Sequence, residues 1–526
     1  MDNPRNKPEP LISFSYDLTT NLSLLRKPKT KPKGLCFSCS FQVMVVSPLC
    51  WLYCLLFSTW WWLTVSTSEM VFFPLTHSLS KTQFTTPHHL LKTTSARSAS
   101  RFRHRHHRHK QVPLPLSPGS DYTLSFTLGS PSSPTISLYL DTGSDLVWLP
   151  CSPFECILCE SKAPPLSPPL NLSASASAVP CKSSTCSAAH SSLHSSDLCA
   201  IARCPLDYIE MSDCNSYPCP PFYYAYGDGS LIARLYKDSL TLPNSLSVQN
   251  FTFGCAHTTL GEPVGVVGFG FGRLSLPAQL SSVSPQLGNR FSYCLISHSF
   301  DSDKVRIPSP LILGRHEDKE KQLGNKIVQF VYTDMLSNPK HPYFYSVGLE
   351  GISVGKRKIP APENLKRVDR RGSGGMVVDS GTTFTMLPAS LYESVVAEFD
   401  HRVGRYYKRA SEVEDSTGLN PCYFYDKVTK VPGITFHFAG NESGVALPRR
   451  NYFYEFMDGG DGVGKKRNVG CMMLMNGGDE EELSGGPGAT LGNYQQQGFE
   501  VVYDLENRKV GFARRKCSSL WDSFEN

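Results

Sequence analysis

The sequence predicts a mainly all-β protein with two similar lobes, and three observations support this fold class. The chain has 526 residues, which is long enough for two domains of ordinary size plus appendages. Hydrophobic residues make up 40% and charged residues 19%, while 40 glycines and 39 prolines indicate many turns. The third observation is a repeat, because residues 138–150 read LYLDTGSDLVWLP and residues 376–388 read MVVDSGTTFTMLP.

Each copy of the repeat carries an aspartate into a tight turn. Asp141 and Asp379 both follow apolar residues typical of a buried strand, and both precede a Ser/Thr, a glycine and a second Ser/Thr. Gly143 and Gly381 let the backbone turn closely under the aspartate. Two capped turns in a β protein are the structural alternative. The repeat instead favours two lobes that meet at one cleft and each contribute a carboxylate.

The charge of the chain is unevenly distributed. The net charge is +6, but the first 110 residues carry 15 Lys/Arg and four Asp/Glu, so the remainder is net acidic. A nucleic-acid binder would concentrate positive charge in its folded part. We therefore expect no nucleic-acid partner.

The region before the lobes begins with two segments. Residues 1–43 are expected to be a disordered extension or a mis-assigned start, and residues 44–68 a signal peptide or signal anchor. If translation starts at Met44, the apolar run 43–65 is a cleaved signal peptide. If it starts at Met1, the run is long enough to anchor the chain in a membrane. Both alternatives predict that the remainder is exported.

Residues 69–115 form a third segment, which is basic and rich in histidine. Its core reads RFRHRHHRHK at 101–110. The segment is predicted to be a prosegment or a solvated linker, and a metal-binding histidine tract is a further alternative. Its histidines would gain charge near their ordinary pKa of about 6.5.

Folded sequence is expected to begin near Leu116. Residues 116–335 form the predicted N-terminal lobe, which includes a cysteine-rich insertion at 151–219. Residues 336–526 form the predicted C-terminal lobe. The insertion has little apolar periodicity, so we expect a surface segment held by disulfides rather than a core element.

Local patterns predict the elements of both lobes. Alternating residues predict strands at 122–128 and 135–140, and PFYYAYGDGS at 221–230 predicts a hairpin with its tip near the glycines. Apolar residues at helical spacing predict a helix over 390–403. FEVVYDLENRKVGFA predicts a terminal hairpin over 499–513.

The cysteines indicate an oxidising compartment. The chain has 18 cysteines, of which 14 lie from Cys151 onward. An even, dense set behind an apolar leader is typical of disulfides. Zinc is the alternative, because Cys156-x-x-Cys159 has ligand-like spacing, although Cys181 and Cys186 are separated by four residues. Connectivity does not follow from the sequence alone.

Two further motifs combine apolar or β-branched residues with glycine. They are Val266-Val267-Gly268 and Thr490-Leu491-Gly492. Glycine at the end of such a strand is typical of two backbones that approach closely. Three sequons provide candidate glycosylation sites, namely Asn171, Asn250 and Asn441.

The paired Asp motifs, the hairpin with Tyr226 and the two apolar-Gly segments resemble those of the pepsin-type aspartic proteases. The resemblance covers roughly residues 116–526. The cysteine pattern and the glutamines after Gly492 are similar to the plant nepenthesin-like branch of that family. The resemblance implies a bilobal pepsin-like acid protease fold, with an active-site cleft between two β lobes and a few short helices.

The resemblance also implies the chemistry. Asp141 and Asp379 would be the catalytic pair, and two nearby carboxylates share one proton because both cannot easily ionise. One carboxylate then activates a water, and the other acts as an acid toward the scissile carbonyl. The pair titrates as a unit, needs no metal or other cofactor, and implies an acidic pH optimum.

Neighbouring residues receive roles by the same resemblance. Thr142 and Ser380 would lock the two turns together, and Ser144 and Thr382 would hydrogen-bond the carboxylates from the side. The indole nitrogen of Trp148 would hydrogen-bond the hairpin tyrosine. The other expected members of the substrate-binding site are Gly143, Gly381, Tyr226, Gly227 and Asp228.

Three disulfides are implied by the resemblance. They are Cys159–Cys219, Cys255–Cys517 and Cys422–Cys471, with further bridges within 181–214. Cys294 would then lack a partner. In the resembling family a basic prosegment covers the acidic cleft until low pH weakens the attraction, which is the functional interpretation of residues 69–115.

We therefore expect a monomeric aspartic endopeptidase that acts on protein or peptide substrates in the secretory pathway, outside the cell or in the cell wall. A vacuolar or membrane-anchored location is the alternative, and a membrane is a partner only if residues 43–65 are retained. The alternative function is a catalytically inactive binding or inhibitor protein on the same fold, similar to the xylanase inhibitors. The intact Asp motifs and Tyr226 favour the enzyme.

Overall fold

The computed structural model describes most of the chain after its first 69 residues. The predicted segments 1–43 and 44–68, and most of 69–115, lie outside the described residues. The described ranges are 70–77, 91–92, 94–95, 98, 122–130, 133–159, 167–226, 229–242, 246–262, 264–298, 307–315, 328–428, 430–440, 444–458, 466–479 and 486–525.

The N-terminal lobe is built on one large sheet. The predicted strands at 122–128 and 135–140 are confirmed and pair as a hairpin. The predicted hairpin at 221–230 is also confirmed, because β6 and β7 pair antiparallel. The strands of this lobe are β2 (Tyr122–Leu128), β3 (Ile136–Asp141), β4 (Val147–Ile157), β5 (Ser177–Ala178), β6 (Phe222–Ala225), β7 (Ser230–Thr241), β8 (Ser247–Leu260) and β9 (Val266–Gly268).

The C-terminal lobe contains shorter strands and the longest helix of the described chain. This helix, α11 (Ala389–Val403), confirms the predicted helix and buries the predicted face of Leu391, Val395, Phe399 and Val403. The strands are β13 (Ser346–Val347), β14 (Leu349–Val354), β15 (Arg357–Pro360), β16 (Met376–Val378), β17 (Thr385–Leu387), β18 (Lys408–Arg409), β19 (Cys422–Tyr425), β20 (Ile434–Phe438), β21 (Gly444–Ala446), β22 (Phe453–Asp458), β23 (Arg467–Met472), β24 (Leu474–Asn476) and β25 (Ala489–Leu491).

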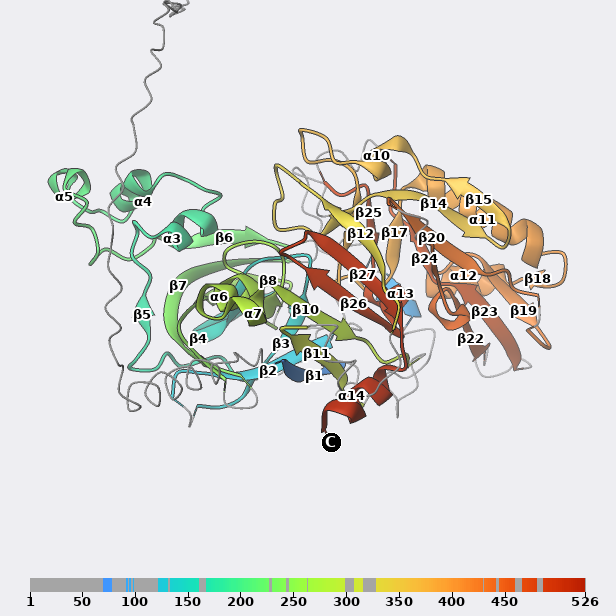
Figure 1. Ribbon diagram of the computed structural model, residues 1–526, viewed down its shortest axis with the longest axis horizontal. Coiled ribbons are helices and arrows are strands. Elements are labelled where there is room, and N and C mark those ends of the chain that lie inside the picture. Colours follow the sequence, from blue (N-terminus) through green and yellow to red (C-terminus); the bar gives the residue numbers. More distant parts are fainter. Residues whose placement is uncertain are drawn as a thin grey trace, which may run out of the picture. The chain divides into compact units, whose positions relative to one another are not determined.

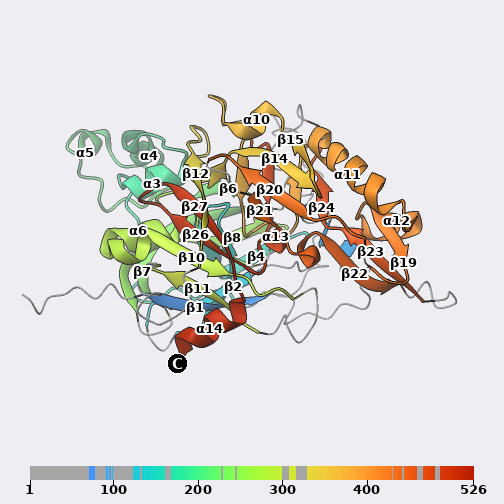
Figure 2. The ribbon, with the colours of Figure 1, turned by 45° about the vertical axis from the view of Figure 1, so that its right-hand side comes forward.

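An antiparallel layer of six strands joins the two lobes (Figures 1 and 2). Its order is β1 (Val71–His77), β11 (Ser309–Leu313), β10 (Arg290–Cys294), β26 (Phe499–Asp504), β27 (Lys509–Arg514) and β12 (Val331–Leu336). The β26–β27 pair confirms the predicted terminal hairpin. Strand β1 corrects the expectation that folded sequence begins near Leu116. Alternation did not reveal β1 because Pro74 interrupts it, and Pro74 lies on a strand paired along most of its length with β11 alone.

Short helices complete the fold. Three of them lie in the cysteine-rich insertion, and α14 follows the terminal hairpin (Figure 1). They are α3 (Ser184–Ala189), α4 (Ser195–Ile201), α5 (Leu206–Glu210), α6 (Leu276–Val283), α7 (Pro285–Gly288), α10 (Glu363–Lys366), α12 (Ser411–Thr417), η3 (Arg449–Asn451), α13 (Asn493–Gln496) and α14 (Cys517–Glu525). In the described part of the chain, no helix has the length and apolar character needed to cross a membrane.

The disulfides differ from two of the three expected pairings. The structure joins Cys156 to Cys159 and Cys186 to Cys219, so the expected Cys159–Cys219 bond is wrong. Cys156 and Cys159 are three residues apart at the end of β4, so they are local partners. The Cys422–Cys471 bond is present, and further bonds join Cys181 to Cys199 and Cys204 to Cys214.

The expected Cys255–Cys517 bond is also wrong, and strand pairing explains why. Cys255 bonds to Cys151, because β4 and β8 run parallel and place Leu149 opposite Cys255. Cys517 instead bonds to Cys294 on β10, which therefore does not lack a partner. With their sulfurs in disulfides, the described cysteines are not free to act as thiolate ligands for zinc, including the two close clusters around Cys181 and Cys186.

Candidate active site

The first Asp turn lies where β3 ends beside β9. The two strands run parallel, with Asp141 opposite Gly268. A Cβ at Gly268 would lie 2.6 Å from the backbone of the residues after the turn, so only glycine allows this approach. The Gly143 N–H donates to Asp141 Oδ1 at 2.8 Å, which fixes the carboxylate under the turn.

The second Asp turn repeats this arrangement. β16 runs parallel to β25, with Val378 opposite Leu491. A Cβ at Gly492 would lie 2.4 Å from the Thr383 carbonyl oxygen. The Gly381 N–H donates to Asp379 Oδ1 at 2.8 Å. The apolar-Gly segments therefore support the two turns from equivalent positions.

The two carboxylates both approach Gly381. A Cβ at Gly381 would be 2.3 Å from Asp141 Oδ1 and 3.2 Å from Asp379 Oδ1. Asp141 is 5% exposed and Asp379 is fully buried. Two carboxylates this close and this buried are the arrangement in which both cannot easily ionise.

Four hydrogen bonds lock the turns across the lobes. The Thr142 N–H donates to Ser380 Oγ at 3.0 Å, and the Ser380 N–H donates to Thr142 Oγ1 at 2.9 Å. The Thr142 hydroxyl then donates to the Val378 carbonyl, and the Ser380 hydroxyl donates to the Leu140 carbonyl, both at 3.1 Å. All four groups are buried, so breaking any one bond leaves an unsatisfied polar atom.

The side-chain bonds to the carboxylates are not symmetric. Thr382 Oγ1 donates to Asp379 Oδ2 at 2.7 Å, as expected. Ser144 Oγ, by contrast, is buried and makes no hydrogen bond of ordinary geometry with any described residue, so its expected bond to Asp141 is wrong. Ser144 instead lies beside the hydroxyl of Tyr226. Its side chain is turned toward the hairpin rather than along the carboxylate.

Tyr226 lies at the end of β6 against Trp148, with their ring centroids 6.2 Å apart. Its backbone N–H donates to the Gly229 carbonyl at 2.7 Å and closes the hairpin. The Tyr226 hydroxyl and Trp148 Nε1 approach one another as the resemblance implies, although neither atom completes a hydrogen bond of ordinary geometry with a described residue. Burial, and next the charge of Asp141, raises the pKa of Tyr226 well above its ordinary value. Gly227 and Asp228 lie outside the described residues.

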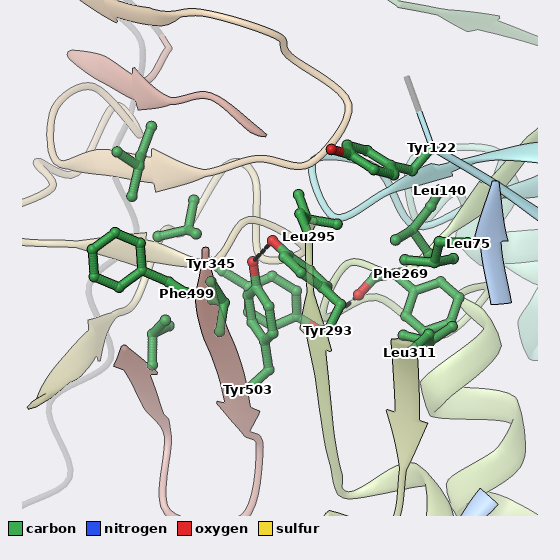
Figure 3. Packing of buried hydrophobic residues seen from close by; sticks show 14 of the residues in the cluster. Leu75, Tyr122, Leu140, Phe269, Tyr293, Leu295, Leu311, Tyr345, Phe499 and Tyr503 are labelled. Atoms are coloured by element: carbon green, nitrogen blue, oxygen red, sulfur yellow. Dashed lines mark hydrogen bonds between the residues drawn. The ribbon is translucent and has the colours of Figure 1, made fainter. Parts of the chain in front are cut away.

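A buried polar network beneath the turns was not identified from the sequence. Gln496 Nε2 donates to the Leu491 carbonyl at 2.9 Å and to the Asp379 carbonyl at 3.4 Å. The Tyr293 hydroxyl donates to Gln496 Oε1, and the Tyr293 and Tyr503 hydroxyls are 2.8 Å apart (Figure 3). The available signal was the QQQ run close after an apolar-Gly strand. Amide side chains that are buried there require hydrogen-bond partners.

Two expected peripheral features have mixed outcomes. Asn171 and Asn250 are exposed, whereas Asn441 lies outside the described residues. From the predicted prosegment, Ser98 Oγ accepts the Phe384 N–H at 3.0 Å, and the Ser95 hydroxyl donates to the Thr417 carbonyl at 3.0 Å. This segment therefore contacts the C-terminal lobe five residues after Asp379.

Two equivalent Asp turns, locked to one another beneath a tyrosine-bearing hairpin, define the site of a pepsin-like aspartic protease. Sequence-family models described as "Xylanase inhibitor N-terminal" and "Xylanase inhibitor C-terminal" match residues 122–315 and 344–514. The chain is 66% identical to a "Probable aspartyl protease" of Arabidopsis thaliana, over 88% of this chain and 95% of that protein. It is 30% identical to "Aspartic proteinase nepenthesin-1" of Nepenthes gracilis, over 76% and 78%. The chain therefore belongs to the plant pepsin-like aspartic protease family.

Solved structures agree with this fold. The crystal structure of edgp matches with a TM-score of 0.55 and 19% identity, over 76% of this chain and 93% of that one. The crystal structure of basic 7S globulin from soybean matches with a TM-score of 0.54 and 16% identity, over 85% and 96%. At these identities the likeness concerns the fold alone.

Proposed function

We propose that the chain is an active, exported aspartic endopeptidase that hydrolyses peptide bonds at acidic pH. The observation that carries this proposal is the complete pair of Asp turns, with Asp141 and Asp379 both beside Gly381 and the Thr142/Ser380 hydrogen bonds intact. One carboxylate takes a proton from a water that attacks the scissile carbonyl, and the protonated carboxyl donates to the carbonyl oxygen. The proton taken from the water then passes to the leaving amine as the peptide C–N bond breaks.

Peptide or protein substrates follow from this chemistry. The aromatic rings of Tyr226, Trp148 and Tyr224 make the hairpin side of the site apolar, which favours apolar side chains near the cleaved bond. The seven disulfides among the described residues support export into an oxidising compartment. The exposed Asn171 and Asn250 are proposed to carry glycans, and the chain is proposed to act as a monomer.

The segment around Ser95 and Ser98 is proposed to act as a prosegment. Its contacts with Thr417 and Phe384 place it against the lobe that carries Asp379. Substrate would reach the catalytic pair more easily once the segment is released. Residues 69–115 are basic and histidine-rich whereas the lobes are net acidic, so protonation of lobe carboxylates at low pH would weaken the attraction between them.

The second candidate function is an inactive binding protein on the same fold. Its support is the description of the two matching family models as xylanase inhibitor domains. The two intact Asp turns favour the enzyme, because a binding protein has no need of a shared proton.

The test is acid treatment of the secreted protein between about pH 3 and 6, followed by cleavage of a denatured protein with and without pepstatin. Asp379→Asn is the control variant, and we expect it to lose at least about a thousandfold in kcat. Its melting temperature should match that of the wild type at the same pH. Absence of cleavage after verified release of the part of residues 69–115 that follows β1 would favour the binding protein.

A further inference from the structure

Asp145 is a second carboxyl group near the catalytic turn, and the proposed mechanism does not use it. It follows Asp141 by four residues, at the end of the turn. Its Oδ1 accepts a hydrogen bond from the Tyr224 hydroxyl at 3.2 Å. Because Tyr224 belongs to β6, this bond connects the catalytic turn to the hairpin that carries Tyr226.

Asp145 packs directly against Gly272, in the space that a side chain there would occupy. A Cβ at Gly272 would lie 1.9 Å from Asp145 Oδ2 and 2.5 Å from its Cβ and Cγ. The loop before Gly272 is tied to the same turn, since the Gly270 N–H donates to the Ser144 carbonyl at 2.8 Å. The carboxyl is therefore held between this loop and Tyr224 rather than free to rotate.

From Tyr224 the contact continues to the substrate side of the site. The Tyr224 and Tyr226 ring centroids are 5.0 Å apart, and Tyr226 packs in turn on Trp148. Trp148 is fully buried on β4, which begins two residues after Asp145. A continuous chain of contacts thus links the turn to the hairpin, running from Asp145 through Tyr224 and Tyr226 to Trp148.

The surroundings of Asp145 hold little positive charge. The ionisable groups nearest the Asp145–Tyr224 pair are Tyr226, Asp141 and Tyr343. Arg273, next to Gly272, is exposed, and among the described residues it makes no ion pair with Asp145. Burial raises the pKa of Asp145 to about 6, although the Tyr224 hydrogen bond lowers it.

We propose that Asp145 is a positioning residue that holds β6 through Tyr224 and thereby sets where Tyr226 lies over the catalytic pair. The role rests on the proposed protease function, because Tyr226 matters there as a contact for the bound peptide. Asp145 does not touch the reacting atoms. Loss of the Asp145–Tyr224 bond should therefore weaken peptide binding more than it slows the chemical step.

Three variants isolate the bond. Tyr224→Phe removes the donor but keeps the ring, and Asp145→Ala removes the acceptor. Asp145→Asn keeps an oxygen that accepts from Tyr224 and removes the titration. The matched control is Tyr223→Phe, because Tyr223 is the neighbouring residue on β6 and its side chain is 58% exposed.

With a fluorogenic peptide at pH 4, we expect Tyr224→Phe and Asp145→Ala to raise KM about fivefold with kcat changed less than about twofold, the effect of one hydrogen bond. Asp145→Asn and Tyr223→Phe should match the wild type. Unchanged KM values in Tyr224→Phe and Asp145→Ala, or equal losses in all four variants, would overturn the proposal.

A second measurement does not depend on catalysis. Hydrogen exchange of the backbone amides of residues 222–226 should be faster in Tyr224→Phe and Asp145→Ala than in the wild type and Tyr223→Phe. If the wild type cleaves no peptide but the exchange difference is present, the protease function fails while the positioning contact stands. Equal exchange in all variants contradicts the contact whatever the activity.

Discussion

The two Asp turns share one backbone design but differ in what surrounds the carboxylate. Asp379 accepts a hydrogen bond from Thr382, and Gln496 supports its carbonyl from below. Asp141 receives no bond from Ser144, which is the equivalent residue, and lies instead beneath Tyr226. Beyond the hydrogen bonds that the two turns share, the C-terminal carboxylate therefore has a side-chain donor in Thr382, whereas the N-terminal carboxylate lies near the aromatic ring of Tyr226.

This difference predicts different functional roles for the two Asp turns. A carboxylate fixed by a side-chain donor and a buried amide keeps its orientation whether or not a ligand is present. A carboxylate next to aromatic rings is in a region that a bound peptide can also contact. The comparison predicts that changes on the C-terminal side reduce kcat, whereas changes on the N-terminal side raise KM.

The largest effect is expected where the two turns differ directly. Thr382→Val should lower kcat at least about tenfold, because a buried hydrogen bond to a charged group contributes about 1.5–3 kcal/mol. Ser144→Ala should lower kcat less than about threefold, since Ser144 Oγ makes no hydrogen bond to Asp141. Steady-state kinetics on one peptide at pH 4 measures both. Equal losses in the two variants would show that the turns are functionally equivalent.

Smaller effects on kcat and KM are expected from Gln496 and Trp148, which support the two turns. Gln496→Leu removes the amide that bonds Tyr293 and two carbonyls, and should lower the free energy of unfolding by about 1–3 kcal/mol and kcat severalfold. Trp148→Phe should cost a similar free energy but act mainly on KM, because Trp148 packs on Tyr226.

Urea unfolding and steady-state kinetics on the same preparations separate these outcomes. Tyr503→Phe serves as the matched control for Gln496→Leu, since it removes only the outer hydroxyl of the network (Figure 3). If Gln496→Leu raised KM with kcat intact, the proposed assignment of kcat effects to the C-terminal turn and KM effects to the N-terminal turn would be wrong.

Features set by local pattern could be predicted from the sequence. Gly143 and Gly381 require tight turns, and the spacing of Leu391 and Val395 requires a helix face, so these elements lie where they were expected. The pairing of Cys255 with Cys151 could not be predicted, because it depends on β4 and β8 running side by side. Resemblance gave the wrong partner in that case.

The side-chain networks escaped prediction for a related reason. The bond between Tyr224 and Asp145 joins residues 79 positions apart, and the Tyr293–Gln496 bond joins residues 203 positions apart. Each polar residue looks ordinary in its own segment. Its partner becomes evident only when the strands are assembled, and then burial makes the partner obligatory.

The smallest effect concerns the pH dependence of stability on the N-terminal side. Folding raises the pKa of Asp145 from 3.8 to about 6, so the folded state favours its protonated form. The wild type should therefore be most stable, with respect to this group, below about pH 4, and should lose that contribution as the pH rises through about 6. Asp145→Asn should lack this loss, so its melting temperature relative to the wild type should increase between these two pH values.

Differential scanning calorimetry of both proteins across this range measures the difference. Glu363→Gln is a useful control of opposite sign, because Lys366 holds the pKa of the exposed Glu363 below its ordinary value. A carboxylate of that kind contributes stability above its unfolded pKa and loses it in acid, and at an exposed site the contribution is small. A melting-temperature difference between wild type and Asp145→Asn that stayed constant with pH would mean that Asp145 titrates alike in the folded and unfolded chains. The packing of Asp145 against Gly272 would then not persist in solution, and the contacts among Tyr224, Tyr226 and Trp148 would lose their connection to the catalytic turn.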